Sequence, residues 1–378
     1  MKGYPYSTRL FPPTFSPWSP TRPRSRQVAV LMSGGVDSSV TAHLLKGAGW
    51  DVLGVTMKIP VSCDPGGRGC CGADAAFVCG ELNLPHYFVD VTEAFDRLII
   101  QPFRQSYSQG LTPNPCVDCN SLLKFALVWD VLEETFGIRH VATGHYARVV
   151  RENGGVRLCR ATNKRKDQSY FLYGIPAHRL ADFILPLGDM SKESVRAMAF
   201  EQNLPVADKA ESMELCFAGE RDYRVALGDD ETHRRGDITD MQGRILGTHE
   251  GIANYTLGQR RGLGFAGGRP LYVGRIDARS NTIALGTRDE VSCRVVVASI
   301  ANALLPNRLV AGGRLFGKIR SYGAPRPCRI VDIERRRLTV EFDEPQFAPC
   351  PGQRLVLYDD RESVVAGGTI VPPGDFSD

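Results

Sequence analysis

An apolar run, a glycine turn and a helix-forming segment follow one another directly near the start of the chain, and this order constrains the fold most. The run at 27–32 leads into Ser-Gly-Gly-Val-Asp-Ser-Ser at 33–39, and a helical pattern continues to residue 46. Glycine allows the backbone to turn tightly and to approach a ligand closely. The N–H groups of the turn and the positive end of the helix dipole favour an anion. The sequence therefore predicts a phosphate-binding turn.

Asp37 is the unusual member of this turn, because a carboxylate beside a phosphate is favourable mainly when Mg²⁺ bridges the two. The turn differs from the Walker loop, whose Gly-x-x-x-x-Gly-Lys-Ser spacing it lacks. A glycine turn without a ligand is the structural alternative. The complete strand–turn–helix context favours a nucleotide site.

Apolar runs alternate with amphipathic segments over residues 27–143, which predicts an α/β fold with a doubly wound parallel sheet. Ligands of such sheets bind beyond the carboxyl ends of the strands, where the turn, Met57 and Gly144 all fall. The expected strands are 27–32, 51–57, 86–91 and 139–143, and the expected helices are 38–46, 73–82, 94–108 and 119–136.

The rest of the chain has a different texture. A helix is expected at 189–203, and short alternating strands with turns from residue 291 predict a small β-barrel. The first 26 residues hold six prolines, five basic residues and no acid, which predicts a disordered tail. The predicted division is a tail at 1–26, a catalytic domain at 27–215, a central module at 216–290 and a barrel at 291–378. The barrel strands are expected at 294–299, 313–320, 329–333, 337–342, 353–358 and 364–370.

Composition excludes several classes of protein. No apolar run approaches the roughly 20 residues that cross a bilayer, so no membrane association is expected. The eleven cysteines are odd in number and follow no signal peptide, which favours reduced thiols in the cytoplasm over a disulfide framework. The net charge is only +4, but residues 148–166 carry seven basic side chains against one acid. Such a run is either a solvated face or a site for phosphates.

Two cysteines have contexts that suit chemistry. Asp118 is expected to cap the helix at 119–136, which would place Cys119 on its first turn and favour the thiolate. A buried Cys119 that merely packs is the alternative. Cys216 lies in a polar segment rich in small residues, for which we predict a mobile loop.

Six motifs in order along the chain resemble those of the tRNA-specific 2-thiouridylases, which belong to the PP-loop ATP pyrophosphatase superfamily. The motifs are the turn at 33–39, Thr-Pro-Asn-Pro with Cys-Asn at 112–120, Ala-Thr-Gly-His-Tyr-Ala-Arg at 142–148, Lys-Asp-Gln-Ser-Tyr-Phe-Leu at 166–172, Leu-Cys-Phe-Ala-Gly-Glu-Arg at 215–221 and Tyr-Thr-Leu-Gly-Gln-Arg-Arg-Gly-Leu-Gly at 255–264.

The resemblance implies an enzyme that replaces the C2 oxygen of the wobble uridine with sulfur in the tRNAs for Lys, Glu and Gln. ATP, with Mg²⁺, adenylates that oxygen. A persulfide on Cys216, loaded by a sulfur-relay protein, delivers sulfur. Cys119 then assists, either by attacking the persulfide to release sulfide or by resolving a Cys119–Cys216 disulfide. A monomer is expected.

The resemblance also implies a role for each matching residue. The catalytic residues are Cys119 and Cys216. The nucleotide contacts are Leu31, Met32, Ser33, Gly34, Gly35, Val36, Asp37, Ser38, Met57 and Gly144. The loop that meets the target base holds Asn114, Pro115 and Cys116. The other tRNA contacts are His145, Lys166, Asp167, Gln168, Arg320, Ser321 and Gln353. The aromatic usual in the pair at 320–321 stands here one place later, as Tyr322.

Cys116 departs from the family, in which Asp is common at this position. Three thiolates from Cys116, Cys119 and Cys216 could ligate a 4Fe-4S cluster, so an iron–sulfur form of the same reaction is an alternative. A second group of cysteines, at 63, 70, 71 and 79, lacks the paired spacing of a zinc knuckle and is expected to form a loop without an assigned role.

Two other classes of function compete with thiolation. Another PP-loop ligase acting on tRNA, such as a lysidine synthetase, would need no paired cysteines. A tRNA-binding protein that has lost catalysis would be expected to show a broken turn or a missing cysteine, and this sequence has neither.

Overall fold

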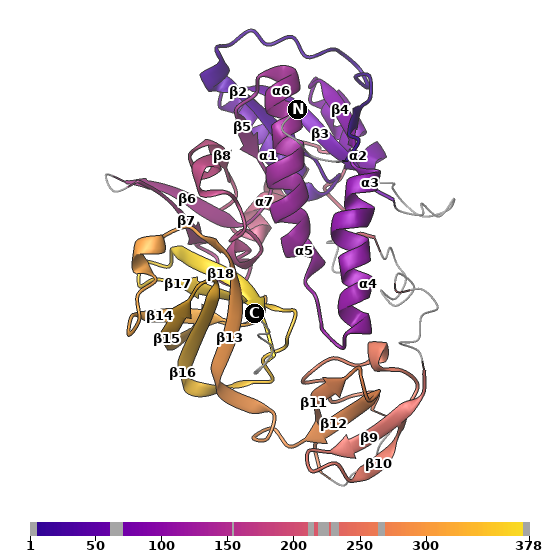
Figure 1. The fold of residues 1–378 in the computed structure, drawn as a ribbon. Coiled ribbons are helices and arrows are strands. Elements are labelled where there is room, and N and C mark those ends of the chain that lie inside the picture. The colour runs from indigo at the N-terminus through magenta and orange to yellow at the C-terminus, as the bar shows by residue number, and fades with distance from the viewer. Residues whose placement is uncertain are drawn as a thin grey trace. The chain divides into compact units, whose positions relative to one another are not determined.

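A computed structural model describes residues 6–60, 71–152, 155–210, 215–217, 227, 234–263 and 269–372 (Figure 1). The chain divides into two compact units. Unit 1 comprises Met1–Ile99 with Cys116–Glu220, and unit 2 comprises Ile100–Pro115 with Arg221–Asp378. Among the helices of the described ranges, none combines the length and the apolar character that a membrane span requires.

Unit 1 is built on a six-stranded sheet whose spatial order is β1 (Arg9–Leu10), β4 (His86–Asp90), β3 (Asp51–Lys58), β2 (Gln27–Leu31), β5 (His140–Ala142) and β8 (Phe183–Ile184). All strands except β1 run parallel to their neighbours. Every residue of β2 is buried, as expected for a parallel strand covered on both faces.

Helices cover both faces of this sheet (Figure 1). On one face Val28 and Val30 of β2 share a core with α1 and α2. On the other face the ring of Tyr87 lies 4.9 Å from that of Phe136, and Phe125 lies 4.8 Å from Phe183. The doubly wound parallel sheet is therefore confirmed. The helices are α1 (Val36–Gly47), α2 (Cys71–Glu81), η3 (Cys119–Val128) and α6 (Trp129–Phe136).

The expected helix at 94–108 is interrupted. The chain forms α3 (Thr92–Phe95), a π-helical turn η2 (Asp96–Ile100) and then α4 (Gln101–Ser108), which has Pro102 in its first turn. Proline has no N–H for the ordinary hydrogen bond to the residue four positions earlier, and the backbone widens before it.

The second half of unit 1 adds elements beyond the sheet. A hairpin carries much of the basic run, and α7 begins with Ser191 as its N-cap, whose hydroxyl accepts from the Ser194 N–H. The elements are β6 (Ala147–Glu152), β7 (Gly155–Arg160), η4 (Ser169–Phe171), η5 (Ala177–Asp182) and α7 (Lys192–Glu201).

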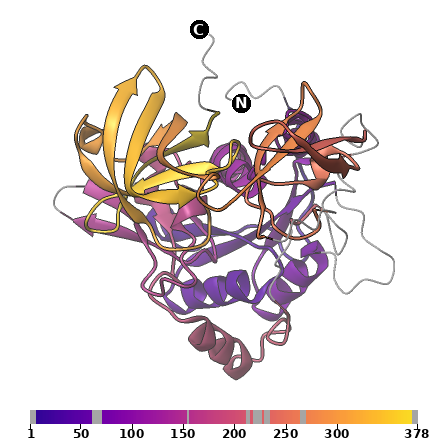
Figure 2. The same cartoon turned by 90° about the horizontal axis from the view of Figure 1, so that it is seen from below.

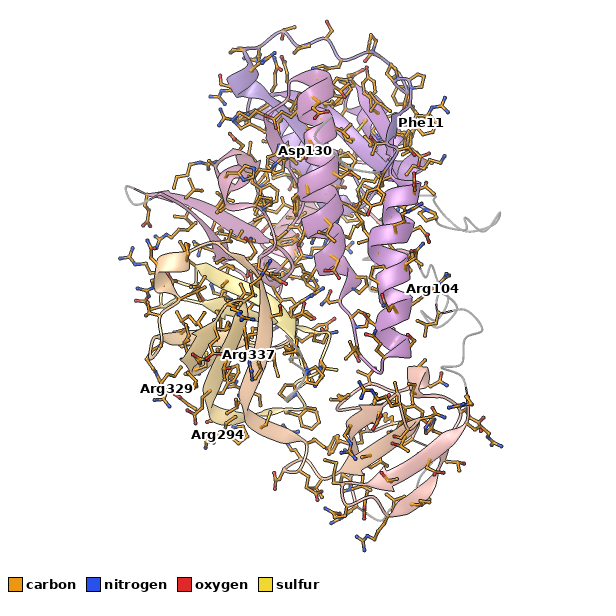
Figure 3. The ribbon with its side chains drawn as sticks, in the orientation of Figure 1. Phe11, Arg104, Asp130, Arg294, Arg329 and Arg337 are labelled. Carbon is orange, nitrogen blue, oxygen red and sulfur yellow. The ribbon has the colours of Figure 1, made fainter. Side chains whose placement is uncertain are left out.

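The N-terminal segment lies against unit 1, contrary to the predicted disordered tail. β1 pairs antiparallel with β4, and the N–H of Phe11, labelled in Figure 3, donates to Phe88 O at 3.0 Å. The Thr21 N–H donates to the Asp51 carboxylate at 2.7 Å. Proline excludes a helix but tolerates an extended edge strand. The tail prediction was therefore wrong for residues 6–26.

Unit 2 contains α4 and a four-stranded sheet. The short helix η8 (Ile252–Asn254) packs against α4 and contributes Ile252 to a core with Val273 and Ile283. The spatial order of the sheet is β10 (Ile245–His249), β9 (Gly236–Asp240), β12 (Thr282–Gly286) and β11 (Tyr272–Asp277).

The C-terminal part of unit 2 is a closed six-stranded barrel, drawn in orange to yellow in Figure 2. Ile330, Val340 and Leu355 are fully buried inside it. All six strands expected from the sequence are present, so the barrel is confirmed. Around the barrel they are β13 (Ser292–Ala303), β16 (Arg337–Phe347), β15 (Arg326–Glu334), β14 (Arg314–Lys318), β17 (Arg354–Tyr358) and β18 (Val364–Ile370).

Candidate active site

The turn at 33–39 lies between β2 and α1, as predicted. Gly34 has a φ of 68°, a left-handed conformation that favours glycine. The Ser38 and Ser39 hydroxyls donate to Gly35 O at 3.1 and 2.9 Å, and Ser38 Oγ accepts from the Ser33 N–H at 3.3 Å. The N-cap of α1 is Gly35, which has no side chain to cap the helix. The first N–H groups of α1 can therefore serve an anion.

Gly144 follows β5 and lies directly against this turn. A Cβ at Gly144 would be 2.7 Å from the backbone carbon of Asp37 and 2.8 Å from Ser38 N. No side chain fits in that space. The two strand ends therefore meet as the sheet topology predicts, whereas the contact of Gly144 with a nucleotide stays a prediction.

The other residues predicted to contact the nucleotide differ in how deeply they are buried. Leu31 and Met32 are buried, so only their backbone can face a ligand. Met57 is half-buried at the end of β3. Its placement suits a residue that packs on a base, and that role stays a prediction.

The Asp37 carboxylate is held by two residues that the sequence did not identify as partners. Lys192 Nζ, at the start of α7, donates to both carboxylate oxygens at 2.7 and 2.8 Å. The Tyr146 hydroxyl donates to Asp37 Oδ1 at 2.9 Å. The Lys192 side chain is only 8% exposed. Hydrogen bonds between an ammonium and a carboxylate are stronger than bonds between neutral groups.

A second lysine contacts the same turn. Lys209 Nζ donates to Gly34 O at 2.9 Å and forms an ion pair with Asp74 of α2. Two lysines thus contact the phosphate-binding turn. Lys192 is the first residue of α7, and Lys209 lies in the segment that follows α7. Neither has a local signal in the sequence, because each depends on contacts more than 150 positions away.

Cys119 differs from its prediction. The helix begins at α5 (Pro115–Asp118), and Asp118 has helical dihedral angles without a capping hydrogen bond from its side chain. Cys119 therefore lies beyond the first turn, where the favourable helix-terminus field has faded. Burial raises the pKa of the Cys119 thiol, Lys124 lowers it and Asp118 raises it. The expected N-cap role of Asp118 was wrong because Pro115 starts the helix one turn earlier.

Lys124, which the sequence did not single out, lowers the pKa of this thiol through its charge. Its ammonium donates to Asn120 Oδ1 at 2.9 Å, and Asn120 Nδ2 donates to Phe171 O at 3.0 Å. Burial and Lys124 together lower the pKa of His145 to about 3, so His145 is neutral at pH 7. His145 contacts Thr143 Oγ1 through Nδ1 at 2.9 Å.

Asp167 and Gln168 both accept hydrogen bonds from within the protein. Asp167 is buried and accepts from Arg160 Nε at 2.9 Å and from the Ala161 N–H at 3.0 Å. Gln168 Oε1 accepts from the Tyr146 N–H at 2.9 Å. Lys166 is half-buried. The tRNA contacts assigned to these three residues stay predictions.

Cys116 and Cys216 are exposed, and Cys119 is buried. Next to Cys216, Phe217 lies edge-on to Phe95 with ring centroids 6.0 Å apart. The rest of the predicted mobile loop, at 211–214 and 218–226, lies outside the described residues. Among the described side chains, no group of three or more His, Cys, Asp or Glu is placed to hold a metal ion. Cys116, Cys119 and Cys216 therefore do not form a ready-made cluster site.

The second cysteine group is only partly described. Residues 61–70 lie outside the described ranges, so the loop expected around positions 63, 70 and 71 is not tested. Cys79 is buried, and burial raises the pKa of its thiol to about 12. Cys79 is therefore a neutral packing residue.

The residues of unit 2 that are predicted to contact tRNA lie in two places. Gln353 contacts the loop of Asn114 and Pro115, with Asn114 Nδ2 3.5 Å from Gln353 Oε1. Arg320 donates to Ala348 O at 2.7 Å and lies over the Phe347 ring, 5.5 Å from its centroid. Ser321 follows Arg320, and Tyr322 is 82% exposed.

The sequence matches three family models along its length. Residues 26–220 match the family model of the tRNA methyl transferase HUP domain, 226–287 the tRNA methyl transferase PRC-barrel domain and 305–371 the aminomethyltransferase beta-barrel domain. Fold and turn together define a PP-loop nucleotide-binding protein. The relatives go further, since a tRNA-specific 2-thiouridylase MnmA from Moorella thermoacetica is 42% identical over 353 residues, 90% of this chain and 98% of that one. The chain belongs to the family of tRNA-specific 2-thiouridylases.

Other relatives are similar over the same span. The tRNA-specific 2-thiouridylase MnmA of Carboxydothermus hydrogenoformans is 40% identical over 361 residues, which cover 91% of this chain and 97% of that one. Among solved structures, the U34-tRNA thiolase NcsA from Methanococcus maripaludis with its [4Fe-4S] cluster is 17% identical, covers 50% of this chain and 60% of that chain, and has a TM-score of 0.33. A likeness this low does not extend to the cluster.

Proposed function

We propose that this protein replaces the C2 oxygen of the wobble uridine in tRNA with sulfur, using ATP. The reaction needs a leaving group, because the amide-like oxygen of uridine is displaced only slowly until it is phosphorylated. The PP-loop would hold ATP so that this oxygen attacks the α-phosphate and pyrophosphate leaves. Sulfur then displaces AMP from C2.

One observation carries this proposal. Unit 1 combines a complete phosphate-binding turn, against which Gly144 lies closely, with cysteines at positions 119 and 216. The turn alone would serve any adenylating enzyme, and the thiols alone would serve many redox proteins. Their combination in a chain of this family suits adenylation followed by sulfur transfer.

The sulfur step balances with the two thiols. A persulfide on Cys216, supplied by a donor protein, carries the sulfur atom to be transferred. When the Cys119 thiolate attacks Cys216 Sγ, hydrosulfide leaves, and a Cys119–Cys216 disulfide forms. Hydrosulfide attacks C2 and AMP departs. An external dithiol must then supply two electrons to reduce the disulfide. The donor protein, the monomeric state and the cytoplasmic location are part of this proposal.

Asp37 is the residue that would hold Mg²⁺, since a carboxylate oxygen is the kind of ligand that this ion prefers. The bound ion would neutralise charge on the phosphates. Both oxygens of Asp37 accept from Lys192 in the structure. Lys192 and the ion therefore compete for one carboxylate, and nucleotide binding would shift Lys192 toward the phosphates.

The iron–sulfur alternative remains part of the proposal as a variant of the same reaction. The described residues favour the form that uses thiols alone, because Cys116, Cys119 and Cys216 are not grouped as ligands. A cluster would require these three side chains to converge. Stoichiometric iron and sulfide in anaerobically purified protein would favour the cluster.

Reconstitution tests the function directly. The purified protein is incubated with ATP, Mg²⁺, a persulfide-generating cysteine desulfurase and unmodified tRNAs for Lys, Glu and Gln. Nucleoside mass spectrometry should detect 2-thiouridine, with one AMP formed for each sulfur transferred. Cys216→Ala should stop thiolation, while Cys293→Ala, at an exposed thiol of the barrel, should not. A methylated or lysine-bearing nucleoside instead would overturn the proposal.

A further inference from the structure

We propose that His86 is a positioning residue, which links an N-terminal strap to the first peptide of the phosphate-binding turn. The strap, residues 7–22, forms hydrogen bonds with β4 and with Asp51 at the start of β3. The inference rests on the proposed function for the identity of the nucleotide, since that function assigns ATP to the turn. All the residues concerned belong to unit 1.

The strap contacts His86 through Thr14. The Thr14 N–H donates to His86 O at 3.0 Å, and Thr14 Oγ1 lies 3.1 Å from His86 Nδ1. Further along the strap, the Trp18 N–H donates to the Tyr87 hydroxyl at 3.0 Å. Because the backbone of Thr14 is itself bonded to His86, the hydroxyl of Thr14 is held against the imidazole ring.

The imidazole ring of His86 has a fixed position in the sheet. It is fully buried, and the Phe88 ring lies edge-on to it with the ring centroids 4.8 Å apart. A Cβ at Gly54 of β3 would lie 3.2 Å from His86 Cδ2, so the neighbouring strand leaves the ring little room. The second ring nitrogen, Nε2, lies 2.8 Å from Thr56 Oγ1. The ring therefore joins the strap to β3.

One arrangement of hydrogens satisfies all these contacts. The Thr56 hydroxyl donates to Met32 O at 3.1 Å, so it has no second hydrogen for the ring. His86 Nε2 must then carry a hydrogen and donate to Thr56 Oγ1. Burial lowers the pKa of His86 to about 4, so the ring is neutral at pH 7 and Nδ1 carries no hydrogen. Nδ1 therefore accepts from the Thr14 hydroxyl, and every donor in this row of bonds points toward the turn.

The row of bonds ends on the peptide that opens the turn. Met32 O and the Ser33 N–H belong to the same planar peptide unit. Thr56 bonds the carbonyl of this unit, and the Ser33 N–H donates to Ser38 Oγ at 3.3 Å. The Met32 N–H donates to Val55 O at 2.7 Å. The peptide is thus held on both sides, which fixes the direction in which the turn leaves β2.

A turn that is fixed before ATP arrives binds phosphate more tightly, because less conformational freedom is lost on binding. The strap, His86 and Thr56 would supply this order without touching the nucleotide. Loss of a hydroxyl from the row should therefore loosen the turn in the free protein and weaken nucleotide binding.

Hydrogen exchange of the free protein tests the end of the row nearest the turn. Thr56→Val removes the hydroxyl but keeps the shape of the side chain. The Ser33 amide should then exchange about fivefold faster, which corresponds to about 1 kcal/mol, the usual contribution of one hydrogen bond. Because a turn opens locally, a loss of global stability alone would speed exchange at Ala29 inside β2 and leave Ser33 unchanged. Unchanged exchange at Ser33 would overturn the proposal.

The other end of the row is tested on the strap. Thr14 is exposed, so Thr14→Val disturbs no core. It should speed exchange at Ser33 about threefold, a change of under 1 kcal/mol. Thr21→Val is the matched control, because Thr21 belongs to the same strap but donates to Asp51. Exchange at Ser33 should stay at the parent rate in this control. Equal rates in the two variants would refute the link through His86.

Nitrogen-15 NMR of the His86 ring tests the assigned hydrogens. The parent protein should carry the ring hydrogen on Nε2, and a hydrogen on Nδ1 would contradict the row of bonds. His86→Gln keeps an N–H donor near the position of Nε2, whereas His86→Leu has none. We expect the affinity for a non-hydrolysable ATP analogue to stay within about threefold of the parent in His86→Gln and to fall about tenfold, or about 1.4 kcal/mol, in His86→Leu.

Calorimetry measures these affinities. Equal losses in the two His86 variants would show that the donor is not what matters and would overturn the positioning role. A parent protein that bound no ATP analogue would instead refute the proposed function, while the exchange and NMR results would still decide this inference.

Discussion

At the scale of single residues, the carboxylate of Asp37 shows how much of a site lies outside its motif. The sequence identifies Asp37 from its place in the turn. It does not identify Lys192, because α7 reaches the turn only through the folded sheet. The Lys192 ammonium lies 5.8 Å from the centroid of the Tyr146 ring, and the Tyr146 hydroxyl bonds the same carboxylate. Local patterns predict the turn, and tertiary contacts complete it.

Removal of Lys192 should impair nucleotide chemistry. Lys192→Met leaves Asp37 without its bidentate partner, and we expect AMP formation to fall about ten- to a hundredfold, the effect of losing a charged hydrogen bond. Lys46→Met is the control, since Lys46 of α1 bonds Leu82 O away from the turn. Titration calorimetry with a non-hydrolysable ATP analogue measures binding separately. Parent-like AMP formation and nucleotide binding would contradict this role.

Lys124 should control the reactivity of Cys119. Because Lys124 lowers the pKa of this thiol, Lys124→Met should raise that pKa and reduce the thiolate fraction at pH 8. Each pKa unit lowers the thiolate fraction about tenfold when pH is below the pKa. Alkylation of Cys119 with iodoacetamide, followed by mass spectrometry over a range of pH, measures the shift. The control is Lys58→Met, whose ammonium pairs with Asp90. An unshifted profile would exclude Lys124 as the cause.

At the scale of elements, the hydrophobic pattern predicted the strands correctly, because each strand buries at least one face. The strands of the parallel sheet and of the barrel appear where alternating or continuous apolar runs predict them. The errors lie in the N-terminal segment, in the interrupted helix at 94–108 and at the start of the helix that carries Cys119. Asp118 has the chemistry of an N-cap, but Pro115 is also suited to a first helical turn and starts the helix earlier.

Gly144 lies so close to the turn at 33–39 that no side chain should be tolerated at this position. Gly144→Ala places a Cβ under 3 Å from Asp37 and Ser38, so we expect a loss of stability of about 1–3 kcal/mol, or displacement of the turn. Gly47→Ala is the matched control, because a Cβ there meets nothing within 4 Å. Thermal unfolding and ATP-analogue affinity report the two effects. If Gly144→Ala matched Gly47→Ala in both, the close approach would be refuted.

At the scale of the whole molecule, the chain forms two compact units, and the phosphate-binding turn and the barrel belong to different ones. The basic barrel surface carries side chains such as Arg294, Arg329 and Arg337, labelled in Figure 3. Arg329 pairs with Glu341, and the Arg294 guanidinium bonds Asp343 O. These arginines are therefore engaged within the barrel itself. Unit 1 supplies the nucleotide site and the thiols.

The sequence predicts a division into consecutive domains, but it does not predict that residues 100–115 belong with the C-terminal part of the chain. Residues 100–115 lie between two parts of unit 1 in the chain, yet their contacts place them in unit 2. The contacts that decide this, such as Gln353 with Thr112, join positions more than 200 apart. The N-terminal segment gives the same lesson, because its edge pairing depends on β4 rather than on its own composition.

The fate of the uridine oxygen is the most direct test of the central claim that AMP carries this atom away as sulfur takes its place. A tRNA with oxygen-18 at C2 of the wobble uridine is converted in a single turnover, and AMP is analysed by mass spectrometry. The account predicts that the phosphate of AMP contains the label in proportion to the 2-thiouridine formed. Unlabelled AMP, with the heavy oxygen released into water, would contradict it.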